Sequence, residues 1–230
     1  MQQTHPLTLA LAALVAALCC QCAAQAQWGY KQVTETDPAL PRVLLVGDSI
    51  VGGYNGQVAA LLQGKANLDY YMTGGHLAVP GFNDQLEKVL TEHRYDVIHF
   101  NESGLHAWPV GRIPEGQYGP LMRQYLAMIR RVAPQAKLIW ASNTPVTVKG
   151  EPDKLDPEIN PTIIALNEAV LPIMIENKVP VDDLYTLMLD KLSLGAGDGF
   201  HWSKAGRDIQ AEAVACAILK ALNPPSEPNP

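Results

Sequence analysis

Short apolar runs alternate with longer stretches of helical periodicity along most of the chain. The runs, which are rich in β-branched and aromatic residues, cover 42–46, 95–100 and 137–141, with weaker ones at 68–72 and 179–184. The stretches with apolar residues at helical spacing cover 57–62, 82–93, 118–132, 161–177 and 204–222. Strands that alternate with helices wind into a parallel sheet with helices on both faces, so the pattern predicts an α/β fold.

Loops join these elements, and a parallel sheet binds ligands beyond the carboxyl ends of its strands, where loops converge. A long segment, 143–160, contains Pro145, Pro152 and Pro157 and has no apolar periodicity. It either flanks or covers a site at that edge, or it is an ordinary solvated loop. Residues 223–230 (NPPSEPNP) have the composition of a disordered tail.

The amino-terminal segment 1–26 differs from the rest because it contains no Lys, Arg, Asp or Glu. Its apolar run from Leu7 to Cys20 ends near Ala24-Gln25-Ala26, which predicts a signal peptide cleaved before Gln27. We therefore expect a secreted or periplasmic bacterial protein. A membrane anchor is the alternative, but the run is short for a membrane span.

Cleavage there leaves Cys216 as the only cysteine, so we expect no internal disulfide in the domain 27–222. Lipid attachment to an earlier cysteine is disfavoured, because the preceding residues Leu18, Cys19 and Gln21 do not provide the small neighbour that it requires. Cys216 lies in an apolar stretch, and we expect it to be buried as a small hydrophobic residue.

The composition fits one domain with a sizeable core, since 47% of the residues are hydrophobic. The net charge is −6 and no cluster of Lys and Arg interrupts it, which disfavours nucleic acid or an anionic membrane surface as a partner. The chain has no His-Glu-x-x-His, paired-Cys, Walker or credible dinucleotide motif. We therefore expect neither a metal ion nor another cofactor.

Two short motifs contain the residues of a nucleophilic site. Gly47-Asp48-Ser49 follows the first predicted strand, and Asp198-Gly199-Phe200-His201 precedes the last predicted helix. A serine hydroxyl is a poor nucleophile until a base takes its proton, and a carboxylate can fix the tautomer of that base. Asp198 can reach Nδ1 of His201 within one turn and leave Nε2 to face Ser49. Either motif alone fits a simple turn, but their joint placement favours catalysis.

These motifs resemble blocks I and V of the SGNH/GDSL hydrolase family, and the resemblance spans about residues 42–222. It implies a flavodoxin-like three-layer α/β/α fold and a catalytic triad of Ser49, His201 and Asp198. It also implies an oxyanion hole formed by the Ser49 amide, a glycine amide from block II and an Asn side chain from block III.

Block III departs from the family pattern Gly-x-Asn-Asp, because Gly104-Leu105-His106-Ala107 stands in its place. The segment VIHFNESGLHAW resembles a bacterial SGNH subgroup in which a strand ending in His-Phe-Asn leads into Gly-Leu-His. We expect a ring N–H of His106 to replace the Asn donor, the alternative being a loop histidine bonded to backbone. Asn101 is a weaker candidate donor. For block II we expect Gly75, with Gly81 as the alternative.

The resemblance implies ester hydrolysis through an acyl-enzyme. Export and the lack of a broad exposed apolar segment favour a polar substrate, so we expect O-acetyl esterase activity on a carbohydrate. A short-chain or lysophospholipid acyl hydrolase is the alternative enzyme. The altered block III leaves a third hypothesis, a catalytically impaired binding module that keeps the fold.

Overall fold

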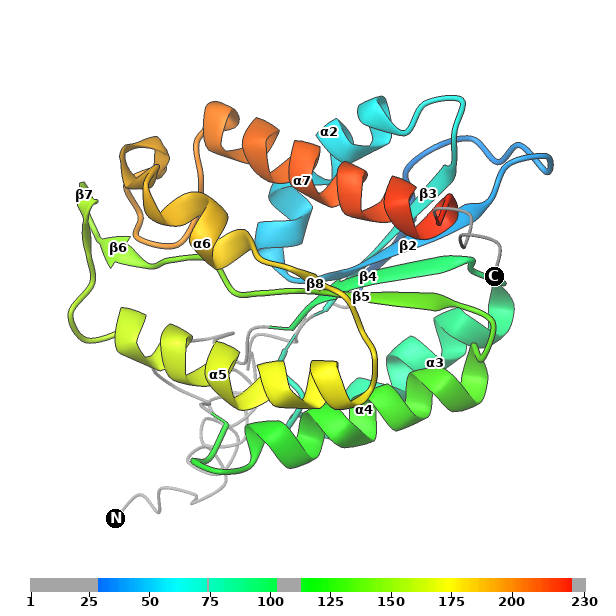
Figure 1. The fold of residues 1–230 in the computed structure, drawn as a ribbon, viewed down its shortest axis with the longest axis horizontal. Helices are drawn as coiled ribbons and strands as arrows, with labels where there is room; N and C mark the ends of the chain where they lie inside the picture. Colours follow the sequence, from blue (N-terminus) through cyan, green and yellow to red (C-terminus); the bar gives the residue numbers. More distant parts are fainter. Residues whose placement is uncertain (1–28, 74, 103–112, 225–230) are drawn as a thin grey trace, which may run out of the picture.

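A six-stranded sheet with the strand order β1-β3-β2-β4-β5-β8 forms the centre of the computed structural model, which describes residues 29–73, 75–102 and 113–224 (Figure 1). The strands are β1 (Gly29–Gln32), β2 (Arg42–Gly47), β3 (Asn67–Met72), β4 (Val97–Asn101), β5 (Lys137–Ala141), β6 (Thr147–Val148), β7 (Glu151–Leu155) and β8 (Val181–Asp182). The helices are α2 (Ser49–Leu61), α3 (Phe82–Glu92), α4 (Tyr118–Val132), α5 (Asn160–Glu176), α6 (Leu184–Leu189), the 3₁₀ turn η1 (Leu192–Leu194) and α7 (Lys204–Leu222).

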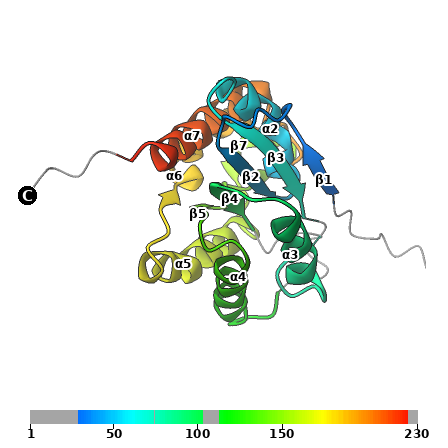
Figure 2. The same cartoon turned by 90° about the vertical axis from the view of Figure 1, so that its right-hand side faces the viewer.

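In this sheet, strands β2, β3, β4, β5 and β8 run parallel to one another, and β1 pairs antiparallel with β3 at one edge. Numbered along the chain without β1, the parallel strands have the order 2-1-3-4-5, which is the flavodoxin-like arrangement. This confirms the predicted α/β fold. The helices that follow β2 and β4 lie on opposite faces of the sheet (Figures 1 and 2), and open α/β sheets bind ligands beyond the carboxyl ends of the strands at such a switch point.

Helices cover both faces of the sheet in three layers (Figures 1 and 2). Helices α2, α6 and α7 lie on one face, and α3, α4 and α5 lie on the other. Each face has its own core. Leu45, Tyr54 and Val214 belong to the first core, whereas Phe100, Tyr125 and Met174 belong to the second. The sheet is therefore packed against helices on both faces, which fixes the positions where the loops at the carboxyl ends of its strands begin.

The predicted elements lie close to the observed ones, with one large shift. Helix α2 begins at Ser49, not at residue 57, because Asp48 caps its first turn by accepting a hydrogen bond from the Ile50 N–H. Gly52 and Gly53 lower the helical propensity of this turn and mask its start in the sequence. Their missing side chains leave room for neighbours, since a Cβ would lie 3.0 Å from the Tyr70 hydroxyl at Gly52 and 3.1 Å from Arg207 Cδ at Gly53.

The sequence pattern missed the edge strand β1, the short α6 and a hairpin formed by β6 and β7. The hairpin lies within the segment 143–160 that we expected to be a loop, and its strand β7 contacts the 3₁₀ turn η1. Strand β6 has only two residues, too few for a period of two to show in the sequence.

The prediction for Cys216 was wrong, because this residue is exposed. Helix α7 buries Val214, Ala215 and Ile218 against the sheet, and Cys216 lies on the opposite side of the helix. An apolar stretch of helix thus contains both buried and exposed positions, and composition alone does not separate them.

Of the helices in the described ranges, none is long and apolar enough to cross a membrane.

Candidate active site

Ser49, His201 and Asp198 form a continuous chain of hydrogen bonds beyond the carboxyl end of β2. The Ser49 Oγ lies 2.8 Å from His201 Nε2, and His201 Nδ1 lies 2.6 Å from Asp198 Oδ2. Ser49 is exposed, and the side chains of His201 and Asp198 are 43% and 48% exposed. The structure thus brings Ser49 to the Asp198–His201 pair, which lies about 150 residues later in the sequence, and leaves all three side chains open to solvent.

The carboxylate of Asp198 fixes the orientation of the imidazole. A carboxylate accepts hydrogen bonds, so the Nδ1 of His201 carries the proton and its Nε2 is left to accept the Ser49 hydroxyl proton. Partial burial raises the pKa of Asp198, but hydrogen bonds from the amides of His201 and Phe200 and from the His201 ring outweigh it. The net pKa of Asp198 lies below its ordinary value, so the group is ionised at neutral pH.

The nucleophile loop, Gly47–Ser49, sits where β2 turns into α2. A side chain at Gly47 has no room, since its Cβ would collide with Val51 and lie 2.8 Å from the Asn101 carbonyl oxygen. Ser49 is the first residue of α2, and the unpaired amides and positive dipole end of a helix favour negative charge nearby. The loop therefore places the hydroxyl where an oxyanion would be stabilised.

The neighbouring strand β3 and the residue after it hold this loop in place. The hydroxyl of Tyr70 on β3 donates to the Asp48 carbonyl at 2.8 Å and lies 3.3 Å from the Gly47 carbonyl. The Thr73 amide donates to the Gly47 carbonyl at 3.0 Å. Both Tyr70 and Thr73 are buried, so the nucleophile loop is fastened to the core of the sheet.

The Asp198–His201 turn is built on glycines with positive φ, at +87° for Gly197 and +96° for Gly199. This conformation favours glycine and explains their placement around Asp198. The turn also closes on itself, because the Ala196 amide donates to the His201 carbonyl at 2.8 Å. The short path between Asp198 and His201 follows from this local geometry.

The candidate oxyanion donors differ in what the structure says of them. Gly75 is buried just after β3, where a Cβ would lie 2.8 Å from Val79 Cγ2. Gly81 is the left-handed residue that precedes α3. The Nδ2 of Asn101 donates to the carbonyl oxygens of Ala141 and Ser142, which joins the ends of β4 and β5.

The amide hydrogens of Asn101 are therefore engaged by backbone, which argues against its use as an oxyanion donor. His106 and the rest of the Gly104–Ala107 segment lie outside the described residues.

Sequence reasoning missed Glu102, a carboxyl group buried at the carboxyl end of β4. Burial and the neighbouring Asp48 carboxylate raise the pKa of Glu102 well above its usual range. Its Oε2 lies 3.5 Å from the Thr73 hydroxyl, and its backbone carbonyl accepts a hydrogen bond from the hydroxyl of Tyr118. Among the described residues, its Oε1 has no hydrogen-bond partner. A buried carboxyl next to the nucleophile loop has no sequence signature.

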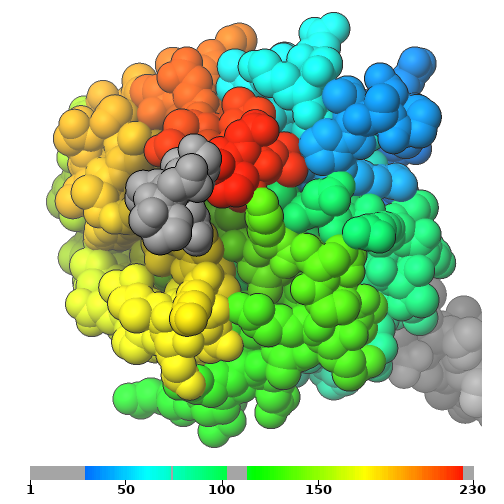
Figure 3. All heavy atoms as spheres, turned by 45° about the vertical axis from the view of Figure 1, so that its right-hand side comes forward, coloured from blue at the N-terminus to red at the C-terminus, as the bar shows by residue number. Residues whose placement is uncertain are grey.

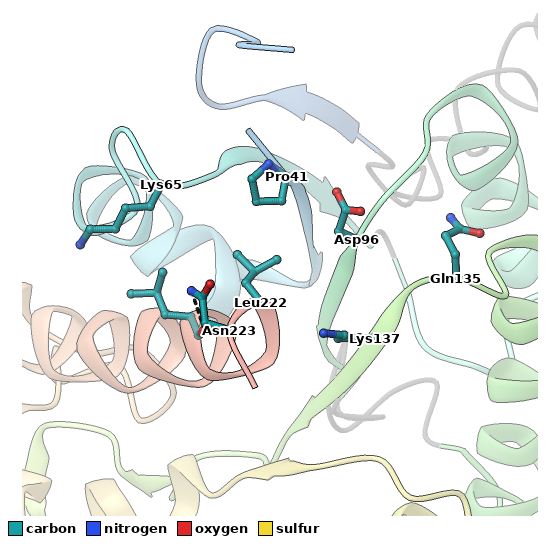
Figure 4. Close-up of a pocket in the computed structure, with 8 residues that line it drawn as sticks. Pro41, Lys65, Asp96, Gln135, Lys137, Leu222 and Asn223 are labelled. Atoms are coloured by element: carbon teal, nitrogen blue, oxygen red, sulfur yellow. Dashed lines mark hydrogen bonds between the residues drawn. The ribbon is translucent and has the colours of Figure 1, made fainter. Parts of the chain in front are cut away.

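A hollow of about 470 Å³ lies at the amino ends of the parallel strands, opposite the end that carries Ser49. Pro41, Asp96 and Lys137, which precede or begin three strands, line it together with the end of α7 (Figure 4). Figure 3 shows this region of the surface, with the end of α7 in red between the blue segment that leads into β2 and the green segments below. The hollow is thus remote from Ser49.

The part of the chain that the structure describes holds no group of three or more His, Cys, Asp or Glu side chains placed to bind a metal ion. What the site offers is a hydroxyl, a base and a carboxylate in series.

The sequence profile of the GDSL-like lipase/acylhydrolase family matches residues 45–209, a range that includes both motifs of the site. The chain belongs to this family. No curated protein sequence matches the chain. Fold comparisons extend the likeness to solved structures.

A carbohydrate acetylesterase from Sinorhizobium meliloti superposes with a TM-score of 0.64 at 15% identity, over 78% of this chain and 98% of that one. An aryl esterase from M. smegmatis superposes with a TM-score of 0.64 at 15% identity, over 79% and 99%. An acetyl xylan esterase superposes with a TM-score of 0.63 at 15% identity, over 77% and 99%. At such identities the likeness establishes the shared fold.

Proposed function

We propose that this family member is an exported serine esterase that removes O-acetyl groups from a carbohydrate through an acyl-enzyme intermediate. The observation that carries the proposal is the hydrogen-bonded series Ser49, His201 and Asp198, with separations of 2.8 and 2.6 Å. Such a series is the arrangement that activates a serine hydroxyl for acyl transfer.

In the proposed reaction, Ser49 Oγ attacks the ester carbonyl carbon while His201 Nε2 takes the hydroxyl proton. Asp198 stabilises the imidazolium that forms. Collapse of the tetrahedral intermediate breaks the bond to the alcohol oxygen, which receives the proton from His201. A water molecule, deprotonated by the same imidazole, then hydrolyses the acyl-Ser49 ester and releases the acid.

The negative charge that develops on the carbonyl oxygen needs donors on the other side of the reacting carbon. We assign the Ser49 amide, at the positive end of α2, and the Gly75 amide, at the end of β3, to this role. We assign the third donor to His106. Its replacement by alanine is expected to lower kcat by about 10²–10³-fold without abolishing the reaction.

The surroundings of the site support a polar substrate. The triad is open to solvent, and the hairpin β6–β7 next to it exposes Lys149, Glu151, Asp153 and Lys154. A long acyl chain binds in an extended apolar pocket, whereas an acetyl group requires little apolar surface. That two of the superposed structures are of a carbohydrate acetylesterase and an acetyl xylan esterase supports the same substrate class.

A panel of acetylated saccharides and nitrophenyl esters of increasing acyl length tests this proposal. We expect acetate release from the saccharides and a fall in kcat/KM beyond two to four acyl carbons, about tenfold or more when the chain no longer fits. The Ser49→Ala variant serves as the background control. A preference for long acyl chains would instead identify a lipid acyl hydrolase, and absence of all hydrolysis would favour a binding module.

A further inference from the structure

The hairpin β6–β7 contacts the Asp198–His201 turn from outside the sheet. The Thr147 amide donates to the Gly199 carbonyl, and the Gly150 amide donates to the Gly197 carbonyl, both at 2.9 Å. These carbonyls lie on either side of Asp198. The hairpin therefore forms hydrogen bonds with both residues that flank Asp198.

Close packing accompanies these hydrogen bonds. A Cβ added at Gly199 would lie 2.8 Å from the Thr147 carbonyl oxygen. A Cβ added at Gly195 would lie 3.2 Å from Pro152 Cβ. Gly199 thus serves a second purpose besides its backbone conformation, because it allows the backbone of the hairpin to approach the turn closely.

The base of the hairpin is rigidly anchored, although its tip is exposed. Residues 142–147 are buried, and the Val146 amide donates to the Oδ1 of the buried Asn160 at the start of α5. Asn143 pairs with the side chain of Asn167 on the same helix. The indole N–H of Trp202, next to His201, lies 3.3 Å from the Thr144 hydroxyl.

We propose that the hairpin Thr147–Leu155 is the positioning element for Asp198 and His201, linking the turn to the buried base of α5. The turn contains the partly buried Phe200 beside a glycine and two half-exposed polar side chains, and none of these residues belongs to either core cluster. Its geometry is set by the hairpin, not by the hydrophobic core. This inference rests on the proposed function for its catalytic consequence, while the placement of the turn stands on the contacts alone.

The variants Gly199→Ala and Gly197→Ala form a matched pair that tests this role. Both residues have positive φ, so both substitutions strain the backbone in the same way. Only the methyl group at 199 meets the hairpin, because nothing lies within 4 Å of a Cβ at 197. A second variant changes the hairpin instead of the turn. In this shortened variant an Asn-Gly turn replaces residues 148–154, which removes the hydrogen bond from the Gly150 amide and the contact of Pro152 with Gly195.

The first readout is the NMR signal of the His201 Nδ1 proton, which a short hydrogen bond to a carboxylate shifts far downfield. We expect this signal in the wild type and in Gly197→Ala, and its loss in Gly199→Ala and the shortened variant. The second readout is kinetic. Displacing the turn by about 1 Å lowers kcat by ~10²-fold with KM little changed.

Thermal unfolding of each variant separates this role from global stability. A downfield signal and a kcat value that are the same in Gly199→Ala and Gly197→Ala, or wild-type values of both in the shortened variant, would overturn the inference. Because the NMR signal does not depend on turnover, an inactive wild type that shows the expected signal changes would refute the esterase proposal and support the positioning role.

Discussion

The two halves of the candidate site are built on different foundations. Gly47 and Ser49 are held by the sheet, where the buried Tyr70 and Thr73 bond the loop and the Asn101 carbonyl leaves no space for a side chain at position 47. The Asp198–His201 turn is instead half exposed and is held by a surface hairpin. One half belongs to the core of the protein and the other is docked onto it.

This difference separates the expected consequences of mutation. A change in the core-held loop alters packed atoms, so stability and activity fall together. A change in the turn removes few buried contacts, so activity falls while stability is nearly kept. The predictions that follow probe this separation in order of decreasing effect.

Replacing His201 by alanine has the largest expected effect on rate. Loss of the base lowers kcat by about 10⁶-fold, as removal of the base from a serine triad does. The side chain is 43% exposed, and surface substitutions usually change stability by no more than ~0.5 kcal/mol. Kinetics on a nitrophenyl acetate and thermal unfolding check both parts. A large fall in Tm would contradict the description of the turn as docked.

Replacing Gly47 by alanine probes the opposite half. The added methyl group collides with Val51, and overpacking of this kind costs about 1–3 kcal/mol of the free energy of unfolding. For a chain of this size, Tm falls by about 2–4 °C per kcal/mol. The control is Gly56→Ala in the helix α2 that follows, where nothing lies within 4 Å of the new Cβ and a gain of about 0.5–1 kcal/mol is expected.

Equal Tm values for the Gly47 and Gly56 variants would show that the nucleophile loop is not packed as described. An intact Tm with lost activity in Gly47→Ala would place this glycine in the same class as the turn.

Removing the Tyr70 hydroxyl with Tyr70→Phe has a smaller expected effect. The loss of its hydrogen bond to the Asp48 carbonyl costs about 1 kcal/mol, and kcat falls by up to about tenfold because the loop relaxes. Tyr95→Phe is the control, because the Tyr95 hydroxyl bonds Asp69, whose carboxylate also binds Arg42 at the start of β2, away from the nucleophile loop. We expect Tyr95→Phe to leave kcat unchanged. Equal kcat values for both variants would remove any specific role of Tyr70 in placing the loop.

Glu102→Gln has the smallest expected effect, which is confined to the pH dependence of stability. The pKa of Glu102 is raised in the folded protein by burial and by Asp48. The folded state therefore binds this proton more tightly than the unfolded state, whose pKa is about 4.3. Stability from this group is present below that value and is lost as pH rises toward the folded pKa.

The glutamine variant lacks this loss, so its Tm relative to that of the wild type rises by a few degrees, on the order of 2–4 °C per kcal/mol, between pH 5 and 8. The exposed Glu151→Gln serves as control, with a curve parallel to the wild type. A parallel curve for Glu102→Gln as well would mean that this carboxyl is ionised in the folded protein.

The fold was largely predictable because strand and helix patterns are local. The parallel strands and the four later long helices lie near their predicted bounds. The start of α2 was not, since Gly52 and Gly53 lower helix propensity for reasons that lie in Tyr70 and Arg207, residues distant in sequence. Strand β6 and the exposed side of α7 at Cys216 depend on tertiary packing in the same way.

The site divides along the same line. Ser49, Asp198 and His201 occur in short motifs that the sequence displays, and the structure brings them within hydrogen-bond distance. The residues that hold this triad in position have no such motif in the sequence. Thr147 and Gly150 act through backbone amides, which any residue except proline supplies, and Glu102 acquires its properties only by burial beside Asp48.

Covalent labelling by a fluorophosphonate tests the central claim most directly, because the reagent adds to a serine hydroxyl that a base has activated. The account predicts one adduct on the peptide that contains Ser49, no adduct in Ser49→Ala, and labelling of the His201→Ala variant that is slower by several orders of magnitude. An unlabelled but folded wild type, or an adduct on a residue other than Ser49, would contradict it.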